Sequence, residues 1–246
     1  MFSILNKTKN NTSLDWIGVD IHSHFLPGLD DGCEDAATSV RLINRLKLLG
    51  ISEVYTTPHV FKDLYPNTPD TINSALIMMR RELHKAKAGI ELFAAAEYMA
   101  DPDFEFLYQS EDLICLPGKH VLLEMSCQFE STCFERYLFT LQAMGYKPIL
   151  AHPERYVYYQ GNMDRYRHFK NRGCLFQMNL LSPAGYYGPE AKKTAMKLLK
   201  AGMIDLVGTD AHKARDLYTI EKFVLSGDAH KIFKKNPIKN AQLFSR

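Results

Sequence analysis

Cysteine is scarce in this sequence and is not arranged for cross-linking. Its 246 residues include five cysteines, and no two of them form a Cys-x-x-Cys pair. An odd number of scattered cysteines is typical of proteins that keep their thiols reduced. We therefore expect a cytoplasmic protein whose fold depends on an apolar core and not on disulfides.

Long apolar runs and an excess of one charge are absent as well. No apolar run approaches the roughly 20 residues of a membrane-spanning helix. The apolar stretch at residues 2–5 is too short for a secretion signal. Lysine and arginine number 30 against 28 acidic residues, which gives a net charge of +2. Neither membrane insertion nor nonspecific binding of nucleic acid is expected.

The sequence instead alternates short apolar runs with amphipathic segments. Residues 1–15 are polar and predict an arm, and residues 16–246 predict a single domain. Strands are predicted at 17–21, 51–57, 90–96, 121–124, 148–151, 175–179 and 204–208. Helices are predicted at 35–49, 69–88, 132–144, 162–172 and 189–201, with a short one beginning near 101. Repeated strand–helix units imply a parallel sheet, and seven strands predict a distorted (β/α)7 barrel.

Two histidines follow the first predicted strand. His22 and His24 are one residue apart, so in an extended segment their imidazoles point the same way and can reach one metal ion. Asp31 follows on a loop beside Gly32, which permits a tight turn. A lone His-x-His pair is weak support for a metal site, so the other strand ends decide the question.

Metal-ligating residue types stand at the ends of six of the seven predicted strands, and only strand 175–179 lacks one. In parallel α/β folds these ends gather on one face. The further candidates are His59, Glu97, Glu124, His152, Asp210 and His212. Nine candidates are too many for one ion, since an ion takes three or four protein ligands, and they suit two or three ions.

The ligand types also indicate the metal and the charge of the substrate. Mixed imidazole and carboxylate ligation without cysteine favours Mn, Fe or Zn. Three divalent ions bring about +6 and the four carboxylates return about −4. The remaining positive charge favours an anionic substrate, phosphate above all.

Two arginines follow candidate ligands at the same spacing. Arg155 stands three residues after His152, and Arg215 stands three residues after His212. Such an arginine could grip phosphoryl oxygens through two N–H groups, or it could simply pair with a nearby carboxylate. Glu154 is expected to play a structural part.

A series of motifs occurs in order between residues 17 and 225. They are His22-Ser23-His24, Asp30-Asp31-Gly32, Thr57-Pro58-His59, Ala96-Glu97, Leu123-Glu124, His152-Pro153-Glu154-Arg155-Tyr156 and Thr209-Asp210-Ala211-His212. Together they resemble the polymerase-and-histidinol-phosphatase (PHP) superfamily. Within it, the chain is most similar to the manganese-dependent protein-tyrosine phosphatases of bacterial capsule and exopolysaccharide operons. The Asp-Asp-Gly spacing and the His-Pro-Glu-Arg-Tyr box are specific to that branch.

This resemblance implies a PHP-type barrel with three divalent ions, manganese first among them. By similarity, one ion would be held by His22, His24, Glu97 and Asp210. A second would be held by Glu97, Glu124 and His152, and a third by Asp31, His59 and His212. Arg155 and Arg215 would bind phosphate. The implied partner is the phosphorylated, tyrosine-rich tail of a membrane tyrosine kinase.

The expected reaction is metal-assisted hydrolysis of a phosphate monoester. A cysteine-based phosphatase needs an arginine six positions after its nucleophile, and none of the five cysteines has one. Three alternatives remain open. The substrate could be a small metabolite such as a sugar phosphate or histidinol phosphate. The protein could be an amidohydrolase, or a non-catalytic protein that holds metals and grips a phosphorylated tail.

Overall fold

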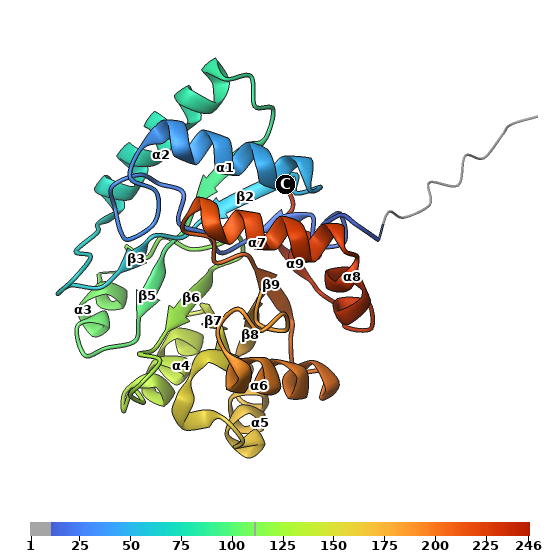
Figure 1. The fold of residues 1–246 in the computed structure, drawn as a ribbon. Helices are drawn as coiled ribbons and strands as arrows, with labels where there is room; N and C mark the ends of the chain where they lie inside the picture. Colours follow the sequence, from blue (N-terminus) through green and yellow to red (C-terminus); the bar gives the residue numbers. More distant parts are fainter. Residues whose placement is uncertain (1–10, 111) are drawn as a thin grey trace, which may run out of the picture.

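The protein is an α/β barrel with its helices on the outside (Figure 1). The structure, a computed structural model, describes residues 11–110 and 112–246. The strands are β1 Val19–Asp20, β2 Glu53–Thr56, β3 His59–Val60, β4 Glu91–Ala94, β5 Glu97–Met99, β6 His120–Glu124, β7 Lys147–Ala151, β8 Leu175–Asn179 and β9 Leu206–Gly208. The helices are α1 Ala36–Leu48, α2 Pro69–Lys85, α3 Phe104–Gln109, α4 Phe134–Ala143, α5 Met163–Asn171, α6 Pro189–Lys200, α7 Ala214–Leu225, α8 Asp228–Phe233 and α9 Asn240–Phe244, with 3-10 turns η1 Pro153–Arg155 and η2 Val157–Tyr159.

All the paired strands run parallel. They form one sheet in the order β1-β2-β4 and a second in the order β3-β5-β6-β7-β8-β9. The two sheets share chain segments, because β3 follows β2 after two residues and β5 follows β4 after two residues. The strands therefore occupy seven consecutive positions around the barrel, as the sequence predicts.

Backbone hydrogen bonds join the last strand position back to the first. The N–H of Asp210 donates to the carbonyl of His22 at 2.8 Å, and the N–H of His24 donates to the carbonyl of Ala211 at 3.0 Å. Ser23 and Ala211 form a parallel bridge. This closure places the segments after β1 and β9 side by side. The predicted α/β barrel is confirmed. Its closure brings together motifs that are far apart in the sequence, such as those that follow β1 and β9.

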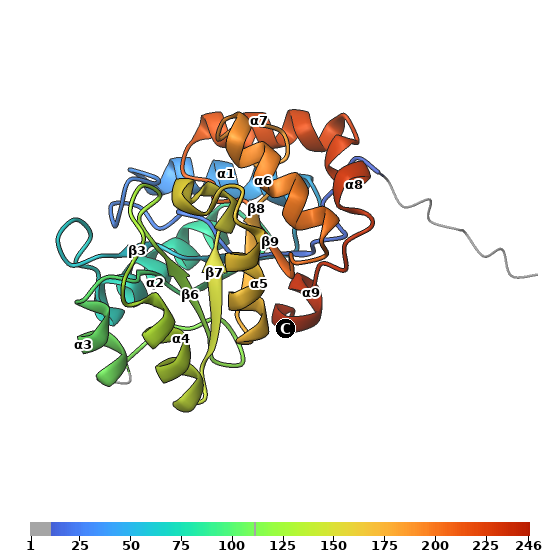
Figure 2. The same ribbon diagram turned by 90° about the horizontal axis from the view of Figure 1, so that it is seen from below.

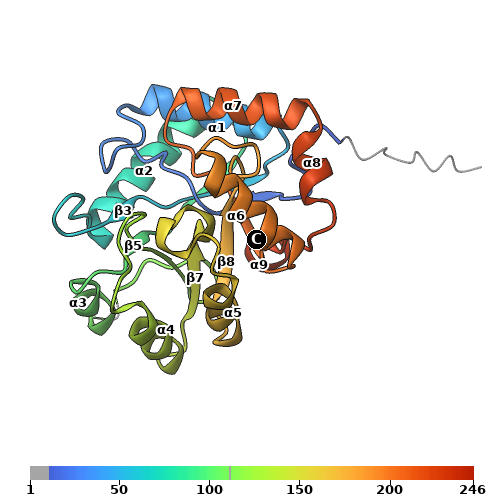
Figure 3. The same ribbon diagram turned by 60° about the horizontal axis from the view of Figure 1, so that its bottom comes forward.

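The helices cover the strands because one face of each is apolar. In α2, Ile72, Leu76, Met79 and Leu83 are buried, as their spacing predicts. Thr68 caps this helix through the N–H of Thr71 at 3.3 Å, and Pro69 occupies its first position. Rotated views show the helices packed around the strands from other directions (Figures 2 and 3). None of the helices within 11–110 and 112–246 is long and apolar enough to cross a membrane.

The structure adds elements at places where the sequence gives weak signals. The two-residue strand β3 is too short for a recognisable pattern. The residue before helix α7, Lys213, provides no capping side chain, and Asp216 instead accepts the Lys213 N–H at 2.8 Å. Most of the predicted arm, residues 1–10, lies outside the described residues. Leu14, within that predicted arm, is buried in the core, so the packing of the barrel begins before residue 16.

Candidate metal centre

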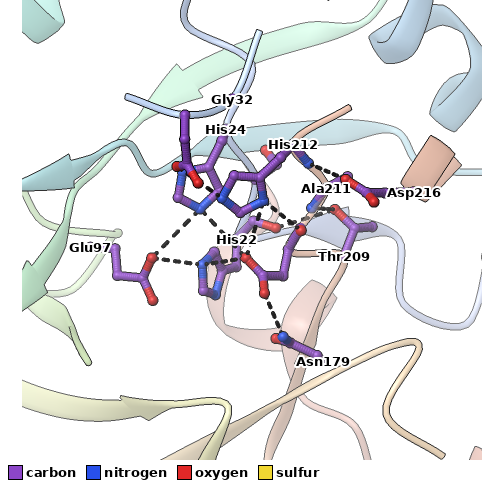
Figure 4. Close-up of polar contacts among 12 residues, drawn as sticks. His22, His24, Gly32, Glu97, Asn179, Thr209, Ala211, His212 and Asp216 are labelled. Carbon is purple, nitrogen blue, oxygen red and sulfur yellow. Dashed lines mark hydrogen bonds and ion pairs between the residues drawn. The ribbon is translucent and has the colours of Figure 1, made fainter. Parts of the chain in front are cut away.

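The nine predicted ligands lie together in one cluster. His59 and Glu97 begin β3 and β5, because the predicted strands 51–57 and 90–96 each break before these residues. Each of the nine ligands has a nitrogen or oxygen within 4.0 Å of an oppositely charged partner from the same set. Figure 4 shows His22, His24, Glu97 and His212 converging from separate segments of the chain. The barrel thus collects residues that are up to 190 positions apart, as His22 and His212 are.

Glu97 lies at the middle of this cluster and is fully buried. Its Oε2 is 3.1 Å from His22 Nε2, 3.1 Å from His59 Nδ1 and 3.5 Å from His24 Nε2. Its Oε1 is 3.0 Å from His152 Nε2. The two oxygens of one carboxylate therefore face different imidazoles, which is the arrangement that a carboxylate shared between two cations requires.

Asp210 presents its two oxygens to different surroundings. Oδ1 lies 3.3 Å from His22 Nε2 and 3.5 Å from His24 Nε2. Oδ2 accepts hydrogen bonds from Arg155 Nη1 at 2.9 Å and from Asn179 Nδ2 at 2.5 Å. Asp210 has a positive φ of 51°, a sparsely populated conformation that tends to occur at functional sites. One oxygen is thus held in place while the other faces the histidines.

Asp31 marks the solvent side of the cluster. Its side chain is 56% exposed, and its Oδ1 lies 3.5 Å from His212 Nε2 and 3.7 Å from His59 Nε2. The His24 and His212 rings stack with centroids 3.8 Å apart. His59 contacts Asp31 through Nε2 and Glu124 through Nδ1, which is 2.8 Å from Glu124 Oε1. The cluster therefore extends from a fully buried floor to an accessible edge.

The hydrogen-bonding state of the histidines fits a metal centre. The buried nitrogens His24 Nε2, His59 Nδ1 and His152 Nδ1 have no partner in hydrogen-bond geometry, although an unpaired buried polar atom is costly. Ligand atoms lie within 4.8 Å of one another in four groups: His24/His59/His212, His22/Glu97/His152, His22/His24/Asp210 and His59/Glu97/Glu124. Such mixed nitrogen and oxygen sets suit Mn, Fe or Zn.

The pKa shifts in the cluster also fit a metal centre. Burial disfavours the charged form of His22, but the carboxylates of Glu97 and Asp210 outweigh it and raise its pKa to about 9. Burial likewise opposes ionisation of Glu97, yet His22 and His59 hold its pKa well below the usual range. Positive charge at His22 and His59 thus favours the ionised form of Glu97. Cations can take over that role as the protons leave.

Asp30 belongs to the Asp30-Asp31-Gly32 motif but is not one of the nine predicted ligands. Its Oδ2 lies 2.7 Å from His24 Nδ1 and accepts the His59 N–H at 3.1 Å. Its Oδ1 accepts the Gly32 N–H at 2.9 Å. A Cβ at Gly32 would lie 2.2 Å from the His24 carbonyl oxygen, so only glycine fits there. Asp30 therefore orients His24, and the paired aspartates of the motif have separate tasks.

The two predicted arginines border one cavity of about 390 Å³, which six of the nine candidates also line. Arg155 donates to Asp210 and packs its guanidinium 4.8 Å from the ring centroid of Tyr187. Arg215 is exposed, and its Nε donates to the Tyr186 hydroxyl at 3.1 Å. Arg155 thus pairs with a carboxylate and also lines the cavity, and its binding of phosphate stays a prediction.

Glu154 is buried and points away from the cluster, in keeping with a structural part. Its Oε1 accepts the Asn179 N–H at 2.9 Å and the Ser182 hydroxyl at 2.5 Å. Burial raises its pKa, and the hydrogen bond from Ser182 opposes this. Glu154 therefore ties the turn that carries His152 and Arg155 to the end of β8.

Comparisons with known proteins agree with this geometry. Residues 18–239 match the family model described as capsular polysaccharide synthesis, CpsB/CapC. The tyrosine-protein phosphatase YwqE of Bacillus subtilis is 30% identical, over 82% of this chain and 81% of that protein. The tyrosine-protein phosphatase CpsB of Streptococcus pneumoniae is 26% identical, over 79% of this chain and 82% of that protein.

Solved structures give the same result. A chain from the crystal structures of Bacillus subtilis YwqE and Streptococcus pneumoniae CpsB, described as unique metal-dependent tyrosine phosphatases, matches with a TM-score of 0.76. It is 27% identical and covers 89% of this chain and 96% of its own. The phosphotriesterase homology protein of Escherichia coli shares the fold, with a TM-score of 0.60 at 14% identity over 93% and 98% of the two chains. The resemblance found from the sequence motifs is confirmed, and the chain belongs to the CpsB/CapC family.

Proposed function

We propose that this chain is a metal-dependent protein-tyrosine phosphatase that acts in capsular or exopolysaccharide synthesis. The observation that carries the proposal is the clustering of five histidines and four carboxylates, six of which line one cavity together with two arginines. The relatives that cover most of the chain are named tyrosine-protein phosphatases. Cluster and relatives point to the same chemistry, the hydrolysis of a phosphate monoester.

The proposed cofactors are three divalent ions, manganese in preference to iron or zinc. His22, His24, Glu97 and Asp210 would hold one ion. Glu97, Glu124 and His152 would hold a second, and Asp31, His59 and His212 a third. Bound ions would lower the pKa of water and neutralise phosphoryl oxygens. The contact between His59 Nδ1 and Glu124 allows His59 to serve the second ion as well.

Arg155 would bind the phosphoryl group on the cavity side of the cluster. Its side chain is 29% exposed, and Asp210 uses only its Nη1. The other N–H groups of the guanidinium can donate to phosphoryl oxygens as charge develops there. Asp210 and the ring of Tyr187 fix the position of Arg155 before substrate arrives. Arg215, held by Tyr186, lines the same cavity and would also contact the phosphate.

Exposed apolar side chains at the cavity end of the barrel favour a protein substrate over a small metabolite. Exposed apolar side chains stand on the segments that follow β3, β5, β6 and β7, which lie at the same end of the barrel as the cluster. They are Leu64, Phe106, Phe129 and Val157. Apolar groups in such positions suit contact with a polypeptide. The proposed partner is the phosphorylated, tyrosine-rich tail of a tyrosine kinase, met in the cytoplasm.

Turnover measurements with added manganese test this proposal. A phosphotyrosyl peptide should be hydrolysed much faster than a phosphoseryl peptide, a sugar phosphate or histidinol phosphate. Asp205→Asn, at the far end of the barrel, is the matched carboxylate control and should keep wild-type turnover. Faster hydrolysis of a small phosphate would assign the protein to metabolite phosphatases. Binding of the phosphopeptide without turnover would assign it to non-catalytic proteins.

A further inference from the structure

Strand β8 has no predicted metal ligand at its end, yet two of its side chains touch the cluster. Gln177 and Asn179 are both completely buried. They are two residues apart on a strand, so they project to the same side. Buried amides need partners for both their oxygen and their nitrogen. Where those partners lie shows what β8 contributes to the site.

The two amides form a continuous chain of hydrogen bonds between two candidate ligands. His22 Nδ1 lies 2.8 Å from Gln177 Oε1. Gln177 Nε2 donates to Asn179 Oδ1 at 3.1 Å, and Asn179 Nδ2 donates to Asp210 Oδ2 at 2.5 Å. Figure 4 shows Asn179 reaching the cluster from below His22. We call these two residues the amide relay.

The donors and acceptors present fix the direction of every hydrogen bond in the amide relay. An ionised Asp210 can only accept, so Asn179 must turn its NH₂ toward it and its oxygen toward Gln177. Gln177 must then donate to that oxygen, which leaves its own oxygen for His22. His22 must therefore carry a proton on Nδ1. The lone pair of a neutral His22 is consequently placed on Nε2, the atom that faces Glu97 and Asp210.

A glycine on the neighbouring strand gives independent support. Gly208 of β9 pairs with Asn179 of β8. A Cβ at Gly208 would lie 2.5 Å from His22 Cβ and 2.9 Å from Gln177 Nε2. Gly208 does not have a positive φ, so its backbone conformation alone does not demand glycine. The missing side chain makes room for His22 and Gln177 to meet.

We propose that Gln177 and Asn179 are positioning residues that hold His22 and Asp210, two ligands of one ion, through a single relay of neutral amides. The inference rests on the proposed metal centre. His24 offers an internal contrast, because a carboxylate, Asp30, orients it. Metal-bound histidines commonly have such an acidic or carbonyl partner. An amide at His22 fixes the ring without adding negative charge to a site that must accept phosphate.

Manganese titration of the metal-free protein tests the relay. Gln177→Met and Asn179→Leu remove its hydrogen bonds at similar side-chain size. Each should weaken manganese binding by roughly 10–100-fold, as losses of ligand-orienting partners do. Because the two residues act through one chain, the double variant should lose less than the two single losses combined. Free Mn²⁺ is measured by electron paramagnetic resonance.

Asn240→Leu is the matched control. Asn240 is also a fully buried amide, but it bonds only backbone: its Nδ2 donates to Val19 and Val207 carbonyls at 2.9 and 2.6 Å. Its replacement should lower the melting temperature of the metal-free protein and leave manganese affinity unchanged. Wild-type affinity in both relay variants, with lowered melting temperatures, would overturn the relay. If one relay variant does not fold, the other decides. Absence of manganese binding by the wild type would refute the metal centre instead.

Discussion

Both ends of the barrel bury carboxylates, but the groups that pair with these carboxylates differ. At the end remote from the cavity, Asp205 accepts from Lys170, from Lys239 Nζ at 2.9 Å and from the Phe176 N–H at 3.0 Å. At the cavity end, Glu97 and Asp210 face mainly imidazoles. At the remote end, the ammonium groups of Lys170 and Lys239 neutralise Asp205. The carboxylates at the cavity end face imidazoles, which can exchange their protons for metal ions, although Asp210 also pairs with Arg155.

The C-terminal segment helps to close the remote end. Glu53 accepts the Ser245 hydroxyl at 2.8 Å and the Arg246 N–H at 3.1 Å. The Arg246 guanidinium lies 4.4 Å from the centroid of the Phe93 ring, and Phe244 is fully buried. Among residues 11–110 and 112–246, no comparable segment covers the cavity, which Arg155 and Arg215 line. The barrel therefore separates a stabilising end from a reactive end.

Replacing the central carboxylate should have the largest effect. Glu97→Gln preserves shape but removes the charge that four imidazoles share. We expect turnover to fall by more than the roughly 10²–10³-fold typical of losing one electrostatic stabiliser, and metal content to fall with it. Asp31→Asn, at the exposed edge, should cost less. Equal residual rates and equal metal content in the two variants would refute the central role of Glu97.

Arg155 comes next, because it faces the cavity but is not a proposed ligand. Arg155→Ala should lower kcat by roughly 10²–10³-fold, and Arg155→Lys should also lower it, since lysine lacks the two-pronged geometry. At saturating manganese, metal content and melting temperature should stay near wild type, because Asn179 still donates to Asp210. A lowered melting temperature with normal kcat would instead make Arg155 a structural partner of Asp210, and phosphate binding would pass to the ions and Arg215.

At the remote end, a substitution should change stability and leave activity unchanged. Asp205→Asn leaves Lys170 and Lys239 without their anionic partner, and should lower the free energy of unfolding by about 1–3 kcal/mol. Turnover per folded molecule and metal content should not change. Denaturant unfolding and kcat measured on the same preparation check both parts. Loss of activity without loss of stability would show that the two ends are not independent.

The pH dependence of that stability is the smallest effect. Burial works against ionisation of Asp205, but Lys170 and Lys239 outweigh it and lower its pKa. As pH falls, the unfolded chain takes up the proton first. The stabilisation is therefore present above the ordinary pKa of 3.8 and is lost as pH falls through the lower folded value. The stability difference between wild type and Asp205→Asn should shrink in acid; a constant difference would contradict this.

The sequence predicts the arrangement of the fold better than its fine structure. Strand β8 and the start of α2 match their predictions because their signals are local. A short, largely apolar run marks β8, and a Thr-Pro pair marks the start of α2. The two-residue strand β3 has no such signal. Residues 1–15 read as polar, yet Leu14 is buried through contacts with distant parts of the chain. The division into an arm and a single domain stays a prediction.

The candidate site follows the same rule. Residues that follow predicted strands can be recognised locally, so the nine residues that meet in the cluster could be named in advance. Gln177 could not be, because its partner His22 is 155 positions away and an amide has no metal-ligand signature. Asp30 stood beside a candidate and was missed for a similar reason: only the fold places it against His24 Nδ1. Residues that orient ligands are visible only in three dimensions.

Counting metal ions tests the central claim most directly. Wild-type protein should be stripped with a chelator, reconstituted with manganese and freed of excess ion, and then subjected to elemental analysis. Nine ligands at three or four per ion predict two to three ions per chain, with phosphotyrosyl-peptide hydrolysis lost on stripping and regained on reconstitution. Asp205→Asn should bind the same number. One ion or none in active protein would contradict the assignment of the cavity end as a multinuclear metal centre.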